Sequence, residues 1–221
     1  MTCFVLLLFF GCGKKKNSDL ARTYYKMSLL ELNQDDQAVG ESAYKKALGH
    51  IDKALHYDKT AEYLALKATI LFKLGKEQKG YEHFEKALQL DVDPQVRAEI
   101  LNNEACLLAQ MGMKEQKNGK IDQAIQIWNG LKDNKDYLTP EVSFFNQSKV
   151  YMFKNDPEKA KENLLTSVQL SPSYVDAHYY LAYVANQLNE EKLAKDHVKI
   201  VLFLEPEHKG AVQLQKILQK T

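Results

Sequence analysis

Apolar residues recur at helical spacing through most of the chain, and short polar stretches divide this pattern into segments of helix length. The clearest case lies between Pro172 and Pro206, where a polar turn at residues 189–191 separates two apolar segments. Apolar residues three and four positions apart lie on one side of a helix, and proline cannot continue a helix. The pattern therefore predicts a helix–turn–helix unit that is closed by a proline at each end.

The length and residue types of this unit point to a repeat. Pro172 and Pro206 are 34 residues apart, which is the period of the tetratricopeptide unit. With Val175 as position 1, Leu181 is position 7, Ala182 position 8, Ala194 position 20, Val201 position 27 and Pro206 position 32. In this register the sequence resembles the tetratricopeptide-repeat family. The resemblance implies an all-α fold, in which antiparallel helix pairs stack into a right-handed superhelical solenoid.

The same register recurs along the chain. It is strict from Ala61 and from Glu141, and looser in two units that contain extra residues. We therefore predict about five hairpins and a capping helix, at residues 19–58, 61–94, 95–138, 141–174, 175–208 and 209–221. Small residues recur at positions 8 and 20, where two helices can pack closely only if their side chains are small: Ala68, Ser148, Ala182, Gly80, Ala160 and Ala194.

The third unit holds seven residues too many between Gly112 and Ala124. Two interpretations are open: the first helix continues through Lys117, or the additional residues form a loop. A loop there could belong to a binding face or be a tolerated insertion. In the same unit, Cys106 lies on an apolar helical face beside two leucines, which predicts a buried, unreactive thiol.

The first residues have a different character. Residues 3–10 are all apolar, and Gly11, Cys12, Gly13 and three lysines follow. A helix of eight residues spans about 12 Å, too short to cross a bilayer, but the run has the length of a signal-peptide core. The end of the run resembles a bacterial lipoprotein signal. The resemblance implies a signal peptide at 1–11, lipidation of Cys12 and a tether at 12–18; the alternative is a short apolar N-terminus with an incidental cysteine.

The composition narrows the function. Thirty basic and twenty-nine acidic residues give a formal charge of +1, which provides no general attraction to nucleic acid. The chain lacks the sequence motifs of zinc proteases, P-loop nucleotide sites and α/β-hydrolases. His178 falls at position 4, a packing position, so we expect a core residue there. We therefore predict no enzyme activity, no metal, no cofactor and no small-molecule substrate.

The resemblance also implies a binding surface, because the first helix of each tetratricopeptide unit lines the concave groove through positions 2, 5, 9, 12 and 13. These positions carry aromatic, amide and lysine side chains suited to an apolar peptide. An alternative is that neighbouring helices or the cap cover some of them. The predicted groove residues are Phe72, Lys73, Phe145, Lys149, Met152, Phe153, Tyr179, Tyr183, Asn186 and Gln187, with Ala65, Thr69, Val142 and Asp176 at further groove positions.

These features together predict a bacterial scaffold that is lipid-anchored in the cell envelope, facing the periplasm, with the outer membrane favoured by Gly13 after the cysteine. Its groove would bind a protein or peptide during assembly of an envelope complex, as pilotins of secretin channels or accessory subunits of outer-membrane protein assembly do. Two alternatives remain: a cytosolic chaperone for secreted substrates, and a regulatory subunit of a peptidoglycan enzyme.

Overall fold

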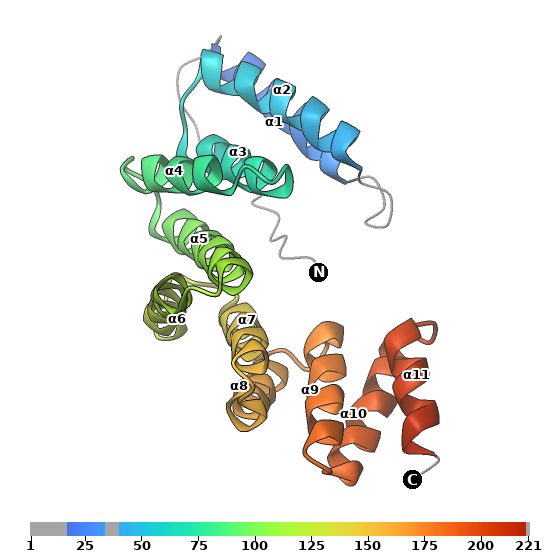
Figure 1. Cartoon of the computed structure of the whole chain (residues 1–221). Helices are drawn as coiled ribbons and strands as arrows, with labels where there is room; N and C mark the ends of the chain where they lie inside the picture. The colour runs from blue at the N-terminus through green and yellow to red at the C-terminus, as the bar shows by residue number, and fades with distance from the viewer. Residues whose placement is uncertain (1–16, 34–39, 220–221) are drawn as a thin grey trace. The chain divides into compact units, whose positions relative to one another are not determined.

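The computed structural model describes residues 17–33 and 40–219, which contain eleven α-helices and no strand (Figure 1). The helices are α1 (Asn17–Leu32), α2 (Glu41–Tyr57), α3 (Ala61–Lys73), α4 (Glu77–Leu88), α5 (Pro94–Glu115), α6 (Asn118–Lys132), α7 (Pro140–Phe153), α8 (Pro157–Leu170), α9 (Val175–Gln187), α10 (Glu191–Leu204) and α11 (Lys209–Leu218). The chain divides into two compact units, of which unit 1 ends at Ile127 and unit 2 begins at Trp128. The predicted all-α fold of helical hairpins is confirmed. The predicted signal, Cys12 and most of the tether lie outside the described residues.

Small side chains bring the two helices of a hairpin together in both units. In unit 1, a Cβ atom added to Gly80 of α4 would lie only 2.9 Å from the carbonyl oxygen of Ala68 in α3. In unit 2, Ala182 of α9 and Ala194 of α10 are completely buried in one apolar cluster. Position 8 of one helix therefore meets position 20 of the next, as the register predicted.

The first hairpin follows the same rule, although its register was loose in the sequence. Ser28 of α1 is fully buried, and its hydroxyl donates a hydrogen bond of 2.9 Å to the carbonyl oxygen of Ala47 in α2. Ala47 stands at position 20, so Ser28 is position 8 of this unit. Serine can fill this position because its hydroxyl finds a backbone acceptor inside the contact.

Three hairpin turns share one backbone geometry at position 15. Gly75, Asn155 and Asn189 have φ angles of 72°, 58° and 61°, and glycine and asparagine tolerate this left-handed region best. In each turn, the next amide closes a six-residue ring onto the end of the helix, as Lys76 N does onto Leu71 O at 2.9 Å. These turns reverse the chain within three residues.

The additional residues of the third unit are helical. α5 continues to Glu115, and Gln116, with φ 55°, ends it directly before α6 begins. The interpretation with a longer first helix therefore holds, although the helix ends two residues before the predicted Lys117, and the loop interpretation is wrong. Gly112 is needed in this long helix because a Cβ there would lie 2.6 Å from Ile121 of α6.

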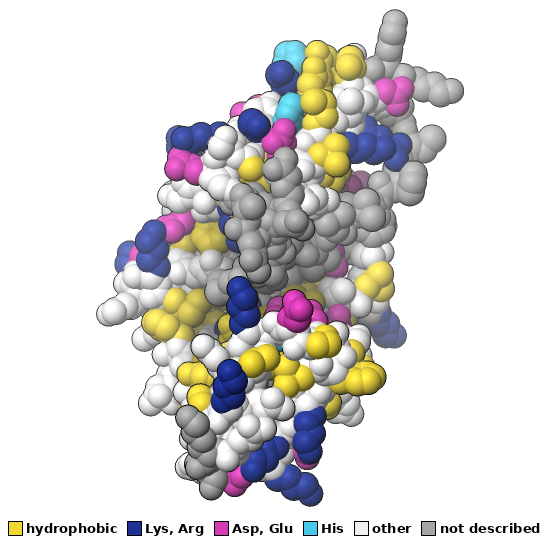
Figure 2. Space-filling model, turned by 90° about the vertical axis from the view of Figure 1, so that its right-hand side faces the viewer, with side chains coloured by type: hydrophobic (Ala, Val, Ile, Leu, Met, Phe, Trp, Pro, Cys, Tyr) yellow, Lys and Arg dark blue, Asp and Glu magenta, His cyan; other side chains and the backbone are white. Residues whose placement is uncertain are grey.

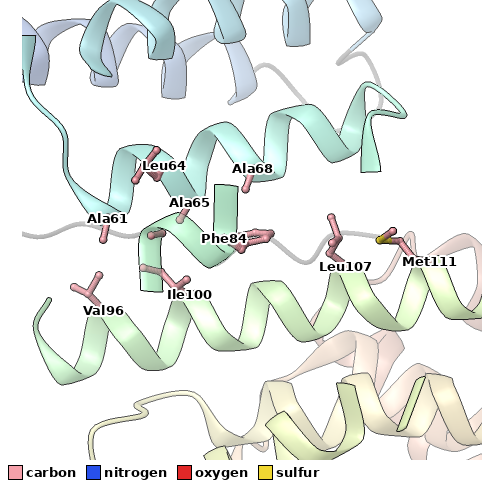
Figure 3. Close-up of a cluster of buried hydrophobic side chains, with 10 residues drawn as sticks. Ala61, Leu64, Ala65, Ala68, Phe84, Val96, Ile100, Leu107 and Met111 are labelled. Carbon is pink, nitrogen blue, oxygen red and sulfur yellow. The ribbon is translucent and has the colours of Figure 1, made fainter. Parts of the chain in front are cut away.

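The cores lie between successive hairpins. In unit 1, α3, α4 and α5 share a cluster built around Phe84 (Figure 3). In unit 2, Leu164 of α8 and Leu181 of α9 are fully buried together. Cys106 is 8% exposed, which confirms that it is a buried thiol. No hairpin buries its apolar side chains alone, so stability depends on stacking.

Two histidines form a polar contact inside the last hairpin. His178 Nε2 lies 3.0 Å from the carbonyl oxygen of Pro172, which accepts, so Nε2 carries the hydrogen. Nδ1 of His178 is then an acceptor, and Nδ1 of His197, 2.7 Å away, donates to it. His178 is neutral in this arrangement, because a proton on its Nδ1 would set two N–H groups against each other. His178, 4% exposed, is thus a core residue, as predicted.

We predict that Ala182→Leu destabilises the chain by about 1–3 kcal/mol, because three further carbon atoms must fit where α9 and α10 meet. Urea unfolding followed by circular dichroism measures this change. Lys192→Leu, at an exposed position of α10, is the control and should change the free energy of unfolding by no more than about 0.5 kcal/mol. Equal stability of Ala182→Leu and the wild type would contradict the packing at position 8.

We also predict that acid weakens the last hairpin through the histidine pair. Burial lowers the pKa of His178, and burial together with the neighbouring His178 lowers the pKa of His197 to about 4, while Asp196 opposes this shift. Because an unfolded histidine has a pKa of about 6.5, the folded state binds fewer protons below that pH. The stability from the neutral pair is therefore complete above about pH 6.5 and is lost as the pH falls toward 4.

Thermal unfolding from pH 7 to pH 4.5 tests this dependence. His197→Phe should be less stable than the wild type at pH 7, because His178 loses its donor, but its Tm should fall less on acidification. His56→Gln, which changes an exposed histidine of α2, should leave the pH dependence unchanged. If wild type and His197→Phe lose Tm in parallel, the pair does not titrate as described.

Candidate functional site

A small recess in unit 1 lies between α3 and α5. Its rim carries Thr69, Phe72 and Lys73 from α3, and Asn103 and Gln110 from α5. Cys106, Leu107 and Phe84 form the remaining walls, and the space is about 30 Å³, room for one methyl group or one water. Phe72 and Lys73 are predicted groove residues, so the structure brings these two together at one depression.

The chemistry of the recess is mixed. Phe72 is half-buried and packs against the core, while Lys73 is exposed. The side-chain amides of Asn103 and Gln110 each offer a donor and an acceptor, the same pair that a peptide group carries. A recess of this kind can take one small side chain of an extended chain and hydrogen-bond the backbone beside it.

In unit 2, the 34-residue period places positions 9, 12 and 13 of α7, α9 and α11 on one face, which we call the first-helix face. It consists of Lys149, Met152, Phe153, Tyr183, Asn186, Gln187 and Ile217. Three of its apolar side chains are open to solvent: Phe153 is 49% exposed, Tyr183 42% and Ile217 55%. Gln187 Nε2 donates to the hydroxyl of Tyr183 at 3.3 Å, which orients the phenol. The face therefore combines exposed apolar groups with amides.

Phe145 corrects one prediction. It was expected to face a partner, but it is only 4% exposed and packs against the rings of Tyr174 and Tyr180, at centroid distances of 5.0 and 5.4 Å. Lys149 lies above its ring, 4.3 Å from the centroid. Phe145 thus holds α7 against α9 and supports Lys149 from below. Ala65, another groove position, is likewise buried, at 2% exposure.

Tyr179 is partly covered by the last helix. Its ring lies 4.7 Å from that of His208, and a Cβ on Gly210 would come within 2.6 Å of the tyrosine. His208 also caps α11 by accepting from the amide of Ala211. The side chain of Tyr179 therefore seats α11 against α9, and only part of it remains accessible.

Of the other predicted residues, Met152 is half-buried in the core of unit 2, and Asn186 is partly accessible. Four residues of the recess and the first-helix face were not among the predicted groove residues: Asn103, Cys106, Gln110 and Ile217. Ile217 could have been found by carrying the register into the last helix, because it follows Tyr183 by 34 residues. The residues of α5 could have been found from Ala105 at position 8, but the additional residues downstream obscured that unit.

The electrostatics are mixed, as Figure 2 shows for one face, where basic and acidic side chains are interspersed among apolar ones. In the part of the chain that the structure describes, histidine, cysteine and acidic residues form no group that could hold a metal ion. Within these same residues, no helix has both the length and the apolar composition needed to span a bilayer. The two surface features described above are an apolar recess beside amides in unit 1 and exposed apolar side chains beside amides in unit 2.

Comparisons with known proteins agree with this architecture. Residues 61–93 and 142–174 each match the model of the tetratricopeptide repeat, so the chain carries tetratricopeptide repeats. A stretch of 76 residues is 37% identical to a TPR repeat-containing protein of Methanocaldococcus jannaschii. This match covers 34% of the chain and spans only 12% of that relative's length.

Two solved structures have a similar fold. PilF of Pseudomonas aeruginosa aligns over 92% of this chain and 85% of its own, with a TM-score of 0.72 and 20% identity. PilW, described as a widely conserved type IV pilus biogenesis factor, aligns over 91% and 93%, with a TM-score of 0.65 and 17% identity. At these identities, the likeness concerns the fold.

Proposed function

We propose that this chain is a membrane-anchored adaptor that binds a protein or peptide segment through the first helices of its hairpins, during assembly of a cell-envelope complex. One observation carries the binding role: Phe153, Tyr183 and Ile217 are exposed at groove positions of three successive first helices. Solvent exposure of large apolar side chains has a cost that a partner removes. A peptide lying across these helices would cover them in turn.

The chemistry of the face indicates the kind of partner. The apolar groups alternate with Gln187, Asn186 and Lys149, which can bond peptide groups or a carboxylate. The recess in unit 1 repeats this combination with Phe72, Lys73 and Gln110. An apolar segment with a free backbone therefore suits both units better than a polyanion or a small polar metabolite.

The envelope role has two supports. The N-terminal sequence resembles a lipoprotein signal, with Cys12 as the residue to be lipidated. The similarity in fold to PilF, and to PilW as a pilus biogenesis factor, fits an assembly function. Because the identities are 20% and 17%, the assignment to an envelope complex is our proposal and rests on fold plus anchor.

We predict that Tyr183→Glu and Phe153→Glu each remove partner binding, because desolvating a carboxylate against an apolar segment costs free energy that the tyrosine and phenylalanine rings do not. Crosslinked pull-down from membranes, with quantitative mass spectrometry, compares them with the wild type. At least a tenfold loss of the specific partner is expected. Circular dichroism should show unchanged folding, since both side chains are substantially exposed.

Phe203→Glu is the matched control. Phe203 is 84% exposed, more than either target residue, but it lies on α10, a second helix. Recovery of the partner should therefore be unchanged in this variant. If Tyr183→Glu and Phe153→Glu retain the partner, or if Phe203→Glu loses it equally, the first-helix face is not the binding surface.

For the anchor, we predict that Cys12→Ser moves the protein from the membrane fraction to the soluble fraction or leaves it unprocessed, because acyl chains can attach only to the cysteine. Intact-mass measurement of the wild type should show loss of residues 1–11 and a lipid adduct. Each buried CH₂ contributes about 0.8 kcal/mol to membrane binding. An unmodified wild-type mass, with Met1 retained, would refute the anchor and favour a cytosolic chaperone.

A further inference from the structure

One apolar residue on the outer side of α1 is exposed, although the residues at the matching position of the other first helices are buried. With Ser28 at position 8, Leu30 is position 10, and it is 67% exposed. The residues at position 10 of the five other first helices are 0–3% exposed: Ile70, Leu107, Val150, Val184 and Leu218. Leu30 is therefore an apolar residue at an interface position whose partner element is missing among the described residues.

At four of these positions the structure shows what covers the side chain. Ile70, Leu107, Val184 and Leu218 each share a cluster with the second helix of the preceding hairpin. That helix contributes large apolar residues at positions 24 and 28. The pairs are Ile51 and Leu55, Phe84 and Leu88, Leu164 and Val168, and Val198 and Leu202. The covering element is thus the same kind of helix at each of these four junctions.

α1 presents the first-helix side of such a junction, but among the described residues no second helix covers it. Leu20 and Met27, 44% and 38% exposed, extend the apolar surface beyond Leu30. From Leu20 to Leu30 the helix rises about 15 Å, or nearly three turns. Lys26 lies one turn before Leu30 and is exposed, so an acidic group beside the apolar ridge would complement it.

We propose that the outer face of α1 (Leu20, Lys26, Met27 and Leu30) is a second docking surface, which binds an amphipathic helix from a partner protein. The geometry specifies that helix: large apolar residues at i and i+4, as at positions 24 and 28, a small or apolar residue at i+3, and an acidic residue facing Lys26. It stacks on α1 as one further second helix. This surface is separate from the first-helix positions that form the proposed peptide site.

The full-length chain in lipid nanodiscs, with ¹³C-labelled methionine methyl groups, tests the proposal. The probe is a helix-stapled peptide with the sequence of residues 157–170, because α8 covers Val184 in this structure. Titration should shift the Met27 methyl signal in a saturable way. Leu30→Lys should weaken peptide binding at least tenfold, and a peptide with Leu164→Ser and Val168→Ser should not bind.

Leu138→Lys is the control, because Leu138 is 64% exposed, close to the value for Leu30, but lies before α7. This variant should bind the peptide as tightly as the wild type does. Absence of a Met27 shift up to millimolar peptide would overturn the proposal, as would equal binding by Leu30→Lys. So would sedimentation showing a dimer that Leu30→Lys dissociates, because a second copy would then occupy the face. Tyr183→Glu should leave this binding intact, which separates the result from the peptide site.

Discussion

The close approach of two helix backbones within each hairpin is the constraint on which the rest of this molecule depends. At Ala68 and Gly80 the approach excludes even a methyl group on the glycine, and at Ala182 and Ala194 it excludes all solvent. Because the hairpins are tight, the large apolar residues are directed outward toward the next hairpin. Each hairpin therefore has two apolar sides, and both are buried when hairpins stack on one another.

Stacking in turn decides which side chains are free for function. Positions 10, 24 and 28 pack between hairpins, whereas positions 9 and 13 of α9 and position 13 of α7 are left at the surface. Tyr183 and Val184 are adjacent in sequence, yet one is 42% exposed and the other fully buried. Binding residues can therefore change without loss of the fold, since the two sets of positions are disjoint.

The sequence predicted the repeating part of this structure well, because small residues at fixed spacing report directly on helix contacts. It predicted the position 8 to position 20 contact and the buried state of His178 and Cys106. It could not place Phe145, because the register marks a position as available but does not show whether neighbouring rings reach it. Tyr174 and Tyr180 come from the next hairpin, and their reach depends on side-chain geometry. The end of α5 could not be placed from the sequence for a similar reason, because polar residues such as those after Gly112 occur in helices and in loops alike.

The two ends of the described chain differ in a way that follows from the same stacking rule. At the C-terminal end, α11 buries Ala211, Leu214 and Leu218 against the last hairpin and exposes Gln213 and Lys216, while Ile217 belongs to the first-helix face. A polar outer side of this kind stops further stacking. At the N-terminal end, α1 turns Leu30 outward instead. The outward apolar residues of α1 therefore form the surface on which we propose that a partner helix stacks.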